Sequence, residues 1–330
     1  MKSYLILGGN GALGVQLTRH LLLQHPHLAV VSVGRNPERA LPFSLHHGID
    51  DSRFRYQQIH IVHEAEKLVQ FVESCQPEVI VNLAAQAESS ASWKNSFYFF
   101  ETNAVALAKI VEPLIGKRWL KKWIQISTSE MYGSLQEPAN EETSIRPASP
   151  YSASKAAADL YLLSLSNAFG FPVNILRPSS VYGPGQALHR LIPKAVLCAL
   201  LGRKLPLQGG GKTVKSYLHT DDFSRAVTSI AEKGEIGKTY HVGPNEGVSI
   251  RHLVELICQR AGASFEKIVE LTEGRLGSDT KSLLDCSRIS KELGWKPEID
   301  LIKGIDSVLA WAREYLSFLE KQPMTYTLQA

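Results

Sequence analysis

The chain has 330 residues, of which 44% are hydrophobic and 21% are charged, and its formal net charge is +4 at pH 7. This length can bury one large hydrophobic core or two modest ones, so we expect a globular enzyme. The small net charge and the short basic runs argue against nucleic-acid binding. No apolar run approaches the length of a membrane span, and the apolar start is too short for a signal sequence. We therefore expect a cytoplasmic protein without a membrane partner.

The cysteines and histidines show no spacing that is typical of a metal site. Cys75, Cys198, Cys258 and Cys286 are scattered, without a Cys-x-x-Cys pair and without neighbouring histidine pairs. Such cysteines are typical of reduced structural thiols. We expect neither disulfides nor a bound metal.

A strand, a glycine turn and a helix follow one another at the start of the chain. The apolar residues 4–7 predict a buried strand, and residues 15–23 predict an amphipathic helix. Between them, the first glycine permits a tight turn, the second lets the backbone approach a pyrophosphate, and the third lets the helix pack on the sheet. The helix N-terminus then faces the phosphates. This pattern predicts a dinucleotide site formed by Gly8, Asn10, Gly11, Ala12, Leu13 and Gly14.

The second predicted strand, residues 29–33, indicates which dinucleotide is bound. It is followed by Gly34, Arg35 and Asn36, with Arg39 close behind, and no carboxylate stands there to accept a ribose hydroxyl. Guanidinium groups pair well with a 2′-phosphate, although arginines after a strand are also often simply solvated. We expect NADP as the cofactor, with NAD as the alternative and with Arg35, Asn36 and Arg39 as contacts.

Strand-like and helix-like segments alternate along the first half of the chain, which predicts a Rossmann-type doubly wound parallel sheet in the α/β class. The later strands are expected at residues 54–62, 78–85, 123–126 and 171–177, and the helices at 65–75 and 101–114.

The pattern changes after Gly185, where shorter segments predict a smaller substrate-binding α/β lobe. We expect residues 1–184 to form the dinucleotide-binding domain, with 221–245 rejoining it, and 185–330 to form mainly the second lobe. Helices are expected at 191–201, 221–232, 250–261 and 302–319, a strand is expected at 238–243, and the tail after Lys321 is expected to be loosely held.

Side chains that can move protons gather near the middle of the chain. Ser127, Thr128 and Glu130 follow a predicted buried strand, and ligands of open α/β sheets bind at the carboxyl ends of strands. Tyr151 and Lys155 share one face if the segment after Pro150 is helical. A neighbouring ammonium would favour the tyrosinate, which can act as a general base. Such a pair also occurs by chance in helices, so its interpretation depends on the strand end and the glycine turn.

Together these motifs resemble those of the extended short-chain dehydrogenase/reductases of the nucleotide-sugar epimerase/dehydratase family. The resemblance runs from Gly8 to Pro297. It rests on the glycine turn and on the segments at residues 82–85, 102–103, 127–133, 151–155, 177–184 and 275–297. It implies a nucleotide-diphosphate sugar as substrate and a nicotinamide cofactor that is reused in each turnover.

The resemblance implies that Tyr151 and Lys155 drive hydride transfer from sugar C4 and that Thr128 holds the sugar hydroxyl. Glu130 favours 4,6-dehydration, because a glutamate at this place removes the C5 proton, whereas the epimerases tend to have small residues there. Ser129 stands where dTDP-glucose 4,6-dehydratases have aspartate, and the Thr-Ser-Glu segment is more similar to that of GDP-mannose 4,6-dehydratases. With Ser129 unable to be a strong acid, Glu130 is expected both to take the C5 proton and to deliver it to the leaving hydroxyl.

The resemblance also implies the ligand contacts. Further cofactor contacts are expected from His60, Ile61, Leu83, Ala84, Ala85, Asn103, Ser127, Tyr151, Lys155, Arg177 and Ser179. Substrate contacts are expected from Glu88, Thr128, Ser180, Arg190, Leu191, Lys215 and Arg275, of which Arg190, Lys215 and Arg275 would pair with the diphosphate. Glu88 replaces a histidine and Lys215 an arginine of the family pattern, so the sequence leaves the base and the sugar open.

Other functions on this scaffold share most of these residues. They are a UDP-glucuronate decarboxylase, a nucleotide-sugar 4-epimerase and a 4-ketoreductase. A decarboxylase would need an arginine that faces the uronate carboxylate, and the sequence assigns no residue to that role. A dinucleotide-binding sensor is disfavoured because Tyr151, Lys155, Thr128 and Glu130 are all present. We expect a homodimer, which relatives form through a four-helix bundle that would here include the helices starting near Glu101 and Tyr151.

Overall fold

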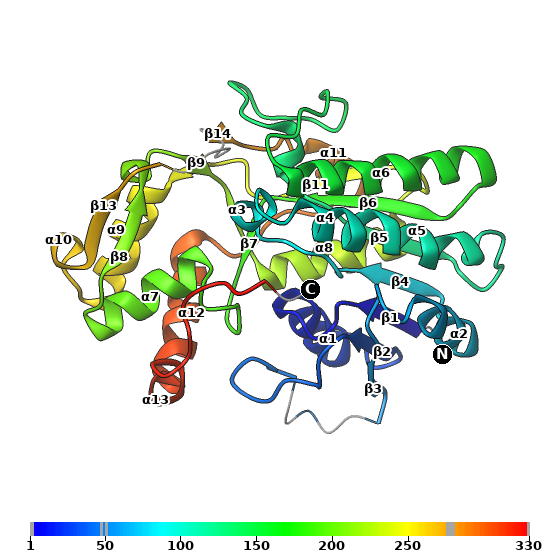
Figure 1. The fold of residues 1–330 in the computed structure, drawn as a ribbon, viewed down its shortest axis with the longest axis horizontal. Coiled ribbons are helices and arrows are strands. Elements are labelled where there is room, and N and C mark those ends of the chain that lie inside the picture. The colour runs from blue at the N-terminus through cyan, green and yellow to red at the C-terminus, as the bar shows by residue number, and fades with distance from the viewer. Residues whose placement is uncertain (1–2, 47–48, 50–51, 275–280, 329–330) are drawn as a thin grey trace.

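The computed structural model describes residues 3–46, 49, 52–274 and 281–328. Its centre is a seven-stranded sheet in the order β11-β6-β5-β4-β1-β2-β3 (Figure 1). Every neighbouring pair is parallel, which confirms the doubly wound fold. The strands are β1 Ser3–Leu7, β2 Ala29–Gly34, β3 Phe54–Gln58, β4 Val79–Asn82, β5 Lys122–Ile126, β6 Val173–Pro178 and β11 Thr239–Val242.

Helices cover both faces of the sheet because successive strand residues point to opposite sides. In β1, Tyr4 and Ile6 pack with α1 (Ala12–Gln24) and α8 (Thr220–Lys233) in one core. Leu5 and Leu7 pack into the other core. That core contains residues of α2 (Ala65–Cys75), α5 (Ala106–Val111) and α6 (Pro150–Phe169).

A second lobe lies beyond β7 (Ser180–Tyr182), on the side of the sheet's carboxyl ends (Figure 1). Its core packs α7 (Leu191–Leu201) against α9 (Ile250–Ala261) and α12 (Leu301–Glu314). The remaining elements are α3 Ser89–Ser92, α4 Ser96–Phe100, η1 Glu101–Val105, η2 Glu112–Leu114, η3 Ser129–Tyr132, β8 Leu205–Gln208, η4 Gly209–Gly211, β9 Val214–Lys215, β10 Tyr217–His219, β12 Val248–Ser249, α10 Phe265–Ile268, β13 Val269–Thr272, β14 Lys281–Ser282, α11 Ser287–Leu293 and α13 Leu316–Leu319.

The structure differs from the sequence prediction at several element ends. The strand predicted at 78–85 ends at Asn82, because its side chain accepts a hydrogen bond from the Ala84 backbone N–H and turns the chain. The strand predicted at 54–62 ends at Gln58. The helix predicted at 101–114 begins at Ser96 and contains a π-helical turn, η1. The helix predicted at 302–319 breaks at Tyr315.

The C-terminal tail is also ordered differently from the prediction. It leaves α13 and runs back across the second lobe towards the sheet (Figure 1). Met324 packs against the core of the second lobe, so apolar contact holds a segment that was expected to be loose. In the described residues, no helix has both the length and the apolar character needed to cross a membrane.

Candidate active site

The glycine turn lies at the carboxyl end of β1, next to the point where the strand order reverses between β1 and β4. Gly8 has a φ of +79°, and a Cβ there would lie 2.7 Å from the backbone nitrogen of Ala84. A Cβ at Gly14 would lie 2.5 Å from Gly9 Cα. These positions therefore require glycine for packing. Gly11 is exposed at the N-terminus of α1, where neither a side-chain cap nor an acidic residue competes for an anion. The turn fits a pyrophosphate.

The segment after β2 is held by Asn10. Its side-chain amide donates to the Pro37 carbonyl at 2.8 Å and accepts from the Arg39 backbone N–H at 3.0 Å. The Tyr56 hydroxyl donates to the Asn36 carbonyl. Burial lowers the pKa of Arg35 from its ordinary value, yet an arginine stays charged in proteins. Asn10 thus positions the backbone that carries the predicted Arg35 and Arg39 contacts.

The predicted adenine-side residues His60 and Ile61 follow β3. The His60 ring accepts hydrogen bonds at Nδ1 from the Val62 and His63 backbone N–H groups, at 3.2 and 3.4 Å. Its own backbone N–H donates to Glu64. This ring edge stabilises the turn that starts α2.

Asn103 organises the loop after β4. Its side chain accepts from the Gln86 backbone N–H at 2.9 Å and donates to the Gln86 carbonyl at 3.0 Å and to Ser154 Oγ at 2.9 Å. Asn103 lies in the π-helical turn η1 and is 3% exposed. Such turns are frequent at functional sites. Asn103 therefore joins the predicted cofactor loop, residues 83–85, to helix α6.

The predicted catalytic residues meet between β5 and α6. Ser149 caps α6 in a reciprocal capping box with Ser152, and Pro150 occupies the first turn, so the helix starts immediately before Tyr151. The Tyr151 hydroxyl lies near enough to Thr128 and Glu130 for both side chains to affect its pKa. Thr128 Oγ1 also accepts the Glu130 backbone N–H at 3.1 Å. The structure thus brings Thr128, Glu130 and Tyr151 to one place.

The protonation of the Tyr–Lys pair differs from the expectation. Burial raises the pKa of Tyr151, and the Glu130 carboxylate raises it further, while the Thr128 side chain acts in the opposite direction. Burial lowers the pKa of Lys155 to about 8. The Lys155 ammonium donates to the Ile126 carbonyl at 2.6 Å. The raised pKa does not favour the tyrosinate that the sequence analysis expected.

Behind Lys155 lies a buried polar network that the sequence did not reveal. One oxygen of Asp159 accepts from Ser127 Oγ at 2.9 Å and from Arg177 Nε at 3.0 Å. Arg177 also donates to the Tyr132 hydroxyl at 2.5 Å. The same hydroxyl lies 2.6 Å from Nε2 of His241. The other ring nitrogen of His241 lies 3.0 Å from the Ala139 carbonyl. Arg177, a predicted cofactor contact, thus has its guanidinium in this network.

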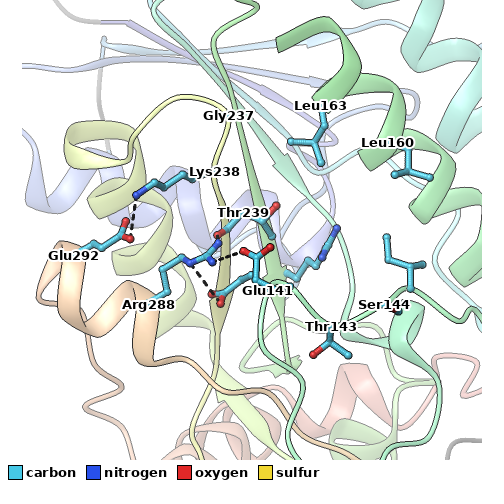
Figure 2. A pocket seen from close by; sticks show the side chains of 13 residues that line it. Glu141, Thr143, Ser144, Leu160, Leu163, Gly237, Lys238, Thr239, Arg288 and Glu292 are labelled. Carbon is cyan, nitrogen blue, oxygen red and sulfur yellow. Dashed lines mark hydrogen bonds and ion pairs between the residues drawn. The ribbon is translucent and has the colours of Figure 1, made fainter. Parts of the chain in front are cut away.

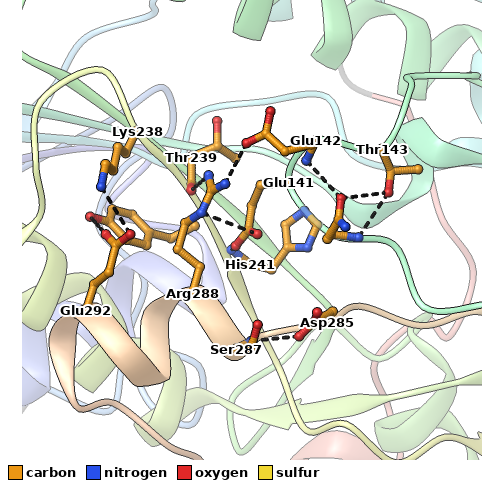
Figure 3. A network of polar contacts seen from close by, with 12 residues as sticks. Glu141, Glu142, Thr143, Lys238, Thr239, His241, Asp285, Ser287, Arg288 and Glu292 are labelled. Atoms are coloured by element: carbon orange, nitrogen blue, oxygen red, sulfur yellow. Dashed lines mark hydrogen bonds and ion pairs between the residues drawn. The ribbon is translucent and has the colours of Figure 1, made fainter.

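The network ends at a cavity of about 520 Å³ on the outer edge of the sheet (Figure 2). Arg288 of α11 reaches the carboxylates of Glu141 and Glu142 there, and Lys238 pairs with Glu292 (Figure 3). The Arg288 pairs connect the loop at residues 137–145 to α11, and the Lys238 pair connects α11 to the start of β11. No residue of the glycine turn lines this cavity, whose walls come from the edge of the sheet around β11.

On the substrate side, the predicted diphosphate contacts already have acidic partners. The Lys215 ammonium lies 3.4 Å from a Glu130 oxygen, and Arg190 lies 3.4 Å from a Glu88 oxygen. His189 lies 3.8 Å from the same Glu88 oxygen. Arg275 falls outside the described residues.

The other predicted contacts line the start of the second lobe. Ser180 opens β7 and Leu191 opens α7. Within the described chain, the buried hydroxyl of Ser179 has no hydrogen-bond partner, which suits a contact with a ligand amide. No group of three or more His, Cys, Asp or Glu side chains that could hold a metal occurs in the same residues.

The tail supplies a residue that sequence reasoning missed. The Tyr326 hydroxyl donates to Gln86 Oε1 at 3.2 Å, and its ring packs edge-on against His189 at 5.1 Å between centroids. Gln86 belongs to the cofactor loop and His189 to the second lobe. Tyr326 therefore bridges the two sides of the site.

The sheet order, the glycine turn and the tyrosine–lysine helix together define an extended short-chain dehydrogenase/reductase scaffold. The family model described as GDP-mannose 4,6 dehydratase matches residues 5–308. The chain belongs to this family.

Relatives and solved structures agree with this assignment. A dTDP-glucose 4,6-dehydratase of Streptomyces griseus is 31% identical over 319 residues, which cover 96% of this chain and 95% of the relative. The enzyme of the same name from Haemophilus influenzae is 29% identical and covers 94% and 98% of the two chains.

Among solved structures, the dTDP-glucose 4,6-dehydratase DesIV of Streptomyces venezuelae, with NAD and TYD bound, has a TM-score of 0.88 at 29% identity and covers 96% of this chain and 98% of that one. The Bacillus anthracis dTDP-glucose 4,6-dehydratase in complex with NAD has a TM-score of 0.87 at 27% identity, with the same coverage.

Proposed function

We propose that the protein is a nucleotide-sugar 4,6-dehydratase, which converts a nucleotide-diphosphate hexose into the 4-keto-6-deoxy product. The observation that carries this proposal is the position of Glu130 beside Thr128 and Tyr151: its backbone N–H donates to Thr128, and its carboxylate raises the pKa of Tyr151. An epimerase needs acid–base groups at C4 alone, whereas dehydration needs a second base that reaches C5. Glu130 is suited to be that base.

The residues divide the reaction between them. Tyr151 must first lose its phenol proton; as the tyrosinate it then takes the proton of the C4 hydroxyl, while Thr128 orients that hydroxyl. A nicotinamide dinucleotide, when bound, would supply the hydride chemistry that oxidises C4 and reduces C6. Glu130 removes the C5 proton, which the adjacent C4 carbonyl has acidified; the C6–O bond breaks, and the hydroxide leaves as water with the proton that Glu130 returns. A solvent-derived proton then completes C5.

We propose NADP as the cofactor. The end of β2 supports this choice, because Gly34, Arg35 and Asn36 provide no carboxylate for the ribose 2′-hydroxyl. Among the described residues that follow β2, the acidic Glu38 is paired with His46 at 2.8 Å. The nucleotide is expected to lie across the glycine turn and the 83–85 loop, with Lys155 and Ser179 towards the nicotinamide.

We also propose a homodimer that is formed through the outer face of α4, η1 and α6. Large apolar side chains are exposed on these elements, with Phe97 at 67%, Val105 at 49% and Leu160 at 58%. Such a group of exposed apolar residues is typical of an interaction surface. Size-exclusion chromatography with light scattering, on the wild type and on Phe97→Asp, would measure the assembly directly.

The test of the activity is mass spectrometry of products formed in heavy water by the purified protein. GDP-mannose, dTDP-glucose, UDP-glucose, UDP-N-acetylglucosamine and UDP-glucuronate would be offered separately. Loss of water together with deuterium at C5 is the expected result and would identify the sugar. Loss of carbon dioxide would instead indicate a decarboxylase, and an isomer of unchanged mass an epimerase. Tyr151→Phe is the control in which each of these reactions should stop.

A further inference from the structure

The ion pair between Glu130 and Lys215 joins the two lobes of the molecule. Glu130 lies in η3 on the carboxyl side of β5, and Lys215 lies 85 positions later in β9 of the second lobe. The atoms Glu130 Oε1 and Lys215 Nζ are 3.4 Å apart. Both side chains are largely covered, at 28% and 20% exposure, so water screens this pair less than it screens an exposed one.

Lys215 is the principal anchor of the Glu130 carboxylate. Within the described part of the chain, no other residue forms a hydrogen bond or ion pair with that carboxylate. The Glu130 carboxylate acts on the Tyr151 phenol by charge alone. A glutamate side chain has several rotatable bonds, and an unanchored one samples many positions. Without Lys215, the base would be poorly aligned with C5.

The backbone of Lys215 is well placed to serve as such an anchor. It pairs with Val248 of β12 on one side and with Ser282 of β14 on the other. A second lysine on β14, Lys281, directs its ammonium to the Gln136 carbonyl instead. The second lobe therefore offers Glu130 one fixed cation.

We propose that Lys215 is the positioning residue of the elimination step, holding Glu130 in line with sugar C5, rather than a contact for the substrate diphosphate. This inference rests on the proposed function. It predicts that Lys215 affects the C5 proton transfer and leaves the earlier C4 oxidation intact, because Tyr151 and Thr128 make no contact with it. A misplacement of a catalytic group by about 1 Å can cost ~100-fold in rate.

The test uses the full-length holoprotein and the nucleotide sugar that the wild type dehydrates. Lys215→Met removes the charge and keeps the length of the side chain, Lys215→Arg restores the charge, and Lys281→Met is the matched control on the neighbouring strand. We expect Lys215→Met to lower kcat by roughly 10- to 100-fold with little change in KM. Reduced nicotinamide and the 4-ketohexose should accumulate, because oxidation continues while elimination is slow. Lys215→Arg should recover most of the rate, and Lys281→Met should behave as wild type.

The opposite pattern would overturn the inference. If Lys215→Met raises KM while kcat stays unchanged and no reduced nicotinamide accumulates, Lys215 binds the diphosphate. Thermal unfolding of each variant establishes that it is folded, and if Lys215→Met unfolds, Lys215→Gln, which also removes the charge, provides the same readouts. A wild type that dehydrates none of the nucleotide sugars would contradict the proposed function itself. A failure of the proposed function can therefore be told apart from a failure of the inference about Lys215.

Discussion

The hydroxyl of Tyr132 lies 2.6 Å from Nε2 of His241, although 109 residues separate them in the chain. Because Arg177 donates to the same hydroxyl, the Tyr132 proton is directed to His241. Nε2 must then be an acceptor, and Nδ1 carries the proton that is donated to the Ala139 carbonyl. His241 is therefore held neutral between Tyr132 and the loop at residues 137–145.

This arrangement predicts a loss of stability in acid. Burial, together with the charge of Arg177, lowers the pKa of His241 from 6.5 to about 3. Below pH 6.5 the unfolded chain binds a proton that the folded chain does not, so stability falls as the pH drops towards 3. The loss is about 1.4 kcal/mol per pH unit. Denaturant unfolding at several pH values should show a shallower slope for His241→Gln than for wild type. The exposed His27→Gln is the control, and equal slopes in all three proteins would contradict the prediction.

Turnover should depend on the charge of Lys155 at mildly alkaline pH. Burial lowers the pKa of this ammonium from 10.5 to about 8 in the folded protein. We expect kcat to fall above pH 8, because the cation that supports the phenol is lost. Between about 8 and 10.5 the unfolded chain holds the extra proton, so the contribution of this group to stability rises with pH while activity falls. A pH profile of kcat measures the first effect. Lys155→Met should remove this fall of kcat above pH 8 together with most of the activity. A wild-type kcat that does not change with pH in this range would contradict the role given to Lys155.

Glu130→Gln should separate oxidation from elimination. The amide keeps the shape of the side chain and cannot take the C5 proton, so dehydration should fall by about 10²- to 10⁴-fold. Bound cofactor should be retained, because Glu130 lies away from the glycine turn. Product analysis and cofactor release after denaturation measure the two quantities. Glu137→Gln, on an exposed position of the same loop, should match wild type. A Glu130→Gln variant that still dehydrates would remove Glu130 from the mechanism.

Arg35→Asp should change the cofactor preference from NADP to NAD. An aspartate at the end of β2 repels a 2′-phosphate and accepts hydrogen bonds from a ribose hydroxyl. The Kd for NADP should rise by roughly 10- to 100-fold, and that for NAD should change little, since one charge-assisted pair contributes about 1.5–3 kcal/mol. Calorimetric titration of both nucleotides is the measurement. Arg55→Asp on neighbouring β3 is the control. Equal weakening of both nucleotides, or of neither, would rule out the NADP proposal.

Tyr326→Ala should weaken the connection between the loop after β4 and the second lobe. The substitution removes the hydrogen bond to Gln86 and the ring contact with His189, which together contribute about 1–2 kcal/mol. We expect retention of the bound nucleotide to weaken by roughly 5- to 30-fold, while the free energy of unfolding falls by no more than about 2 kcal/mol. Tyr326→Phe keeps the ring and should give an intermediate value. Unchanged dissociation rates in both variants would show that the tail has no part in binding.

The sheet could be predicted from sequence because its strands are short apolar segments with local signals. The run 4–7 followed by glycines, and the apolar segment before Ser127, both correspond to buried strands. The α6 start was readable because Ser149 and Pro150 are a local cap. The parallel order then brings Thr128, Glu130 and Tyr151 together at the carboxyl ends of strands.

The polar partners could not be predicted in the same way. Asp159 is one helical turn beyond Lys155, yet its partners Ser127 and Arg177 come from two different strands. The pairing of Lys215 with Glu130 depends on how the second lobe folds over the sheet, which no local pattern encodes. The π-helical turn around Asn103 likewise depends on tertiary contacts, here with Gln86 and Ser154. The tyrosine–lysine motif predicted that Tyr151 and Lys155 share one face of a helix. It could not predict that burial raises the pKa of Tyr151.

The path of the tail has a practical consequence for handling the protein. Tyr326 touches Gln86 after β4 and His189 at the start of the second lobe, so a purification tag or fluorophore fused behind it would begin close to the proposed nucleotide site. The amino end of β1 lies on the side of the sheet that faces away from the second lobe (Figure 1). A tag placed there leaves this site unobstructed, and a dye attached near Tyr326 would report directly when a ligand enters or leaves.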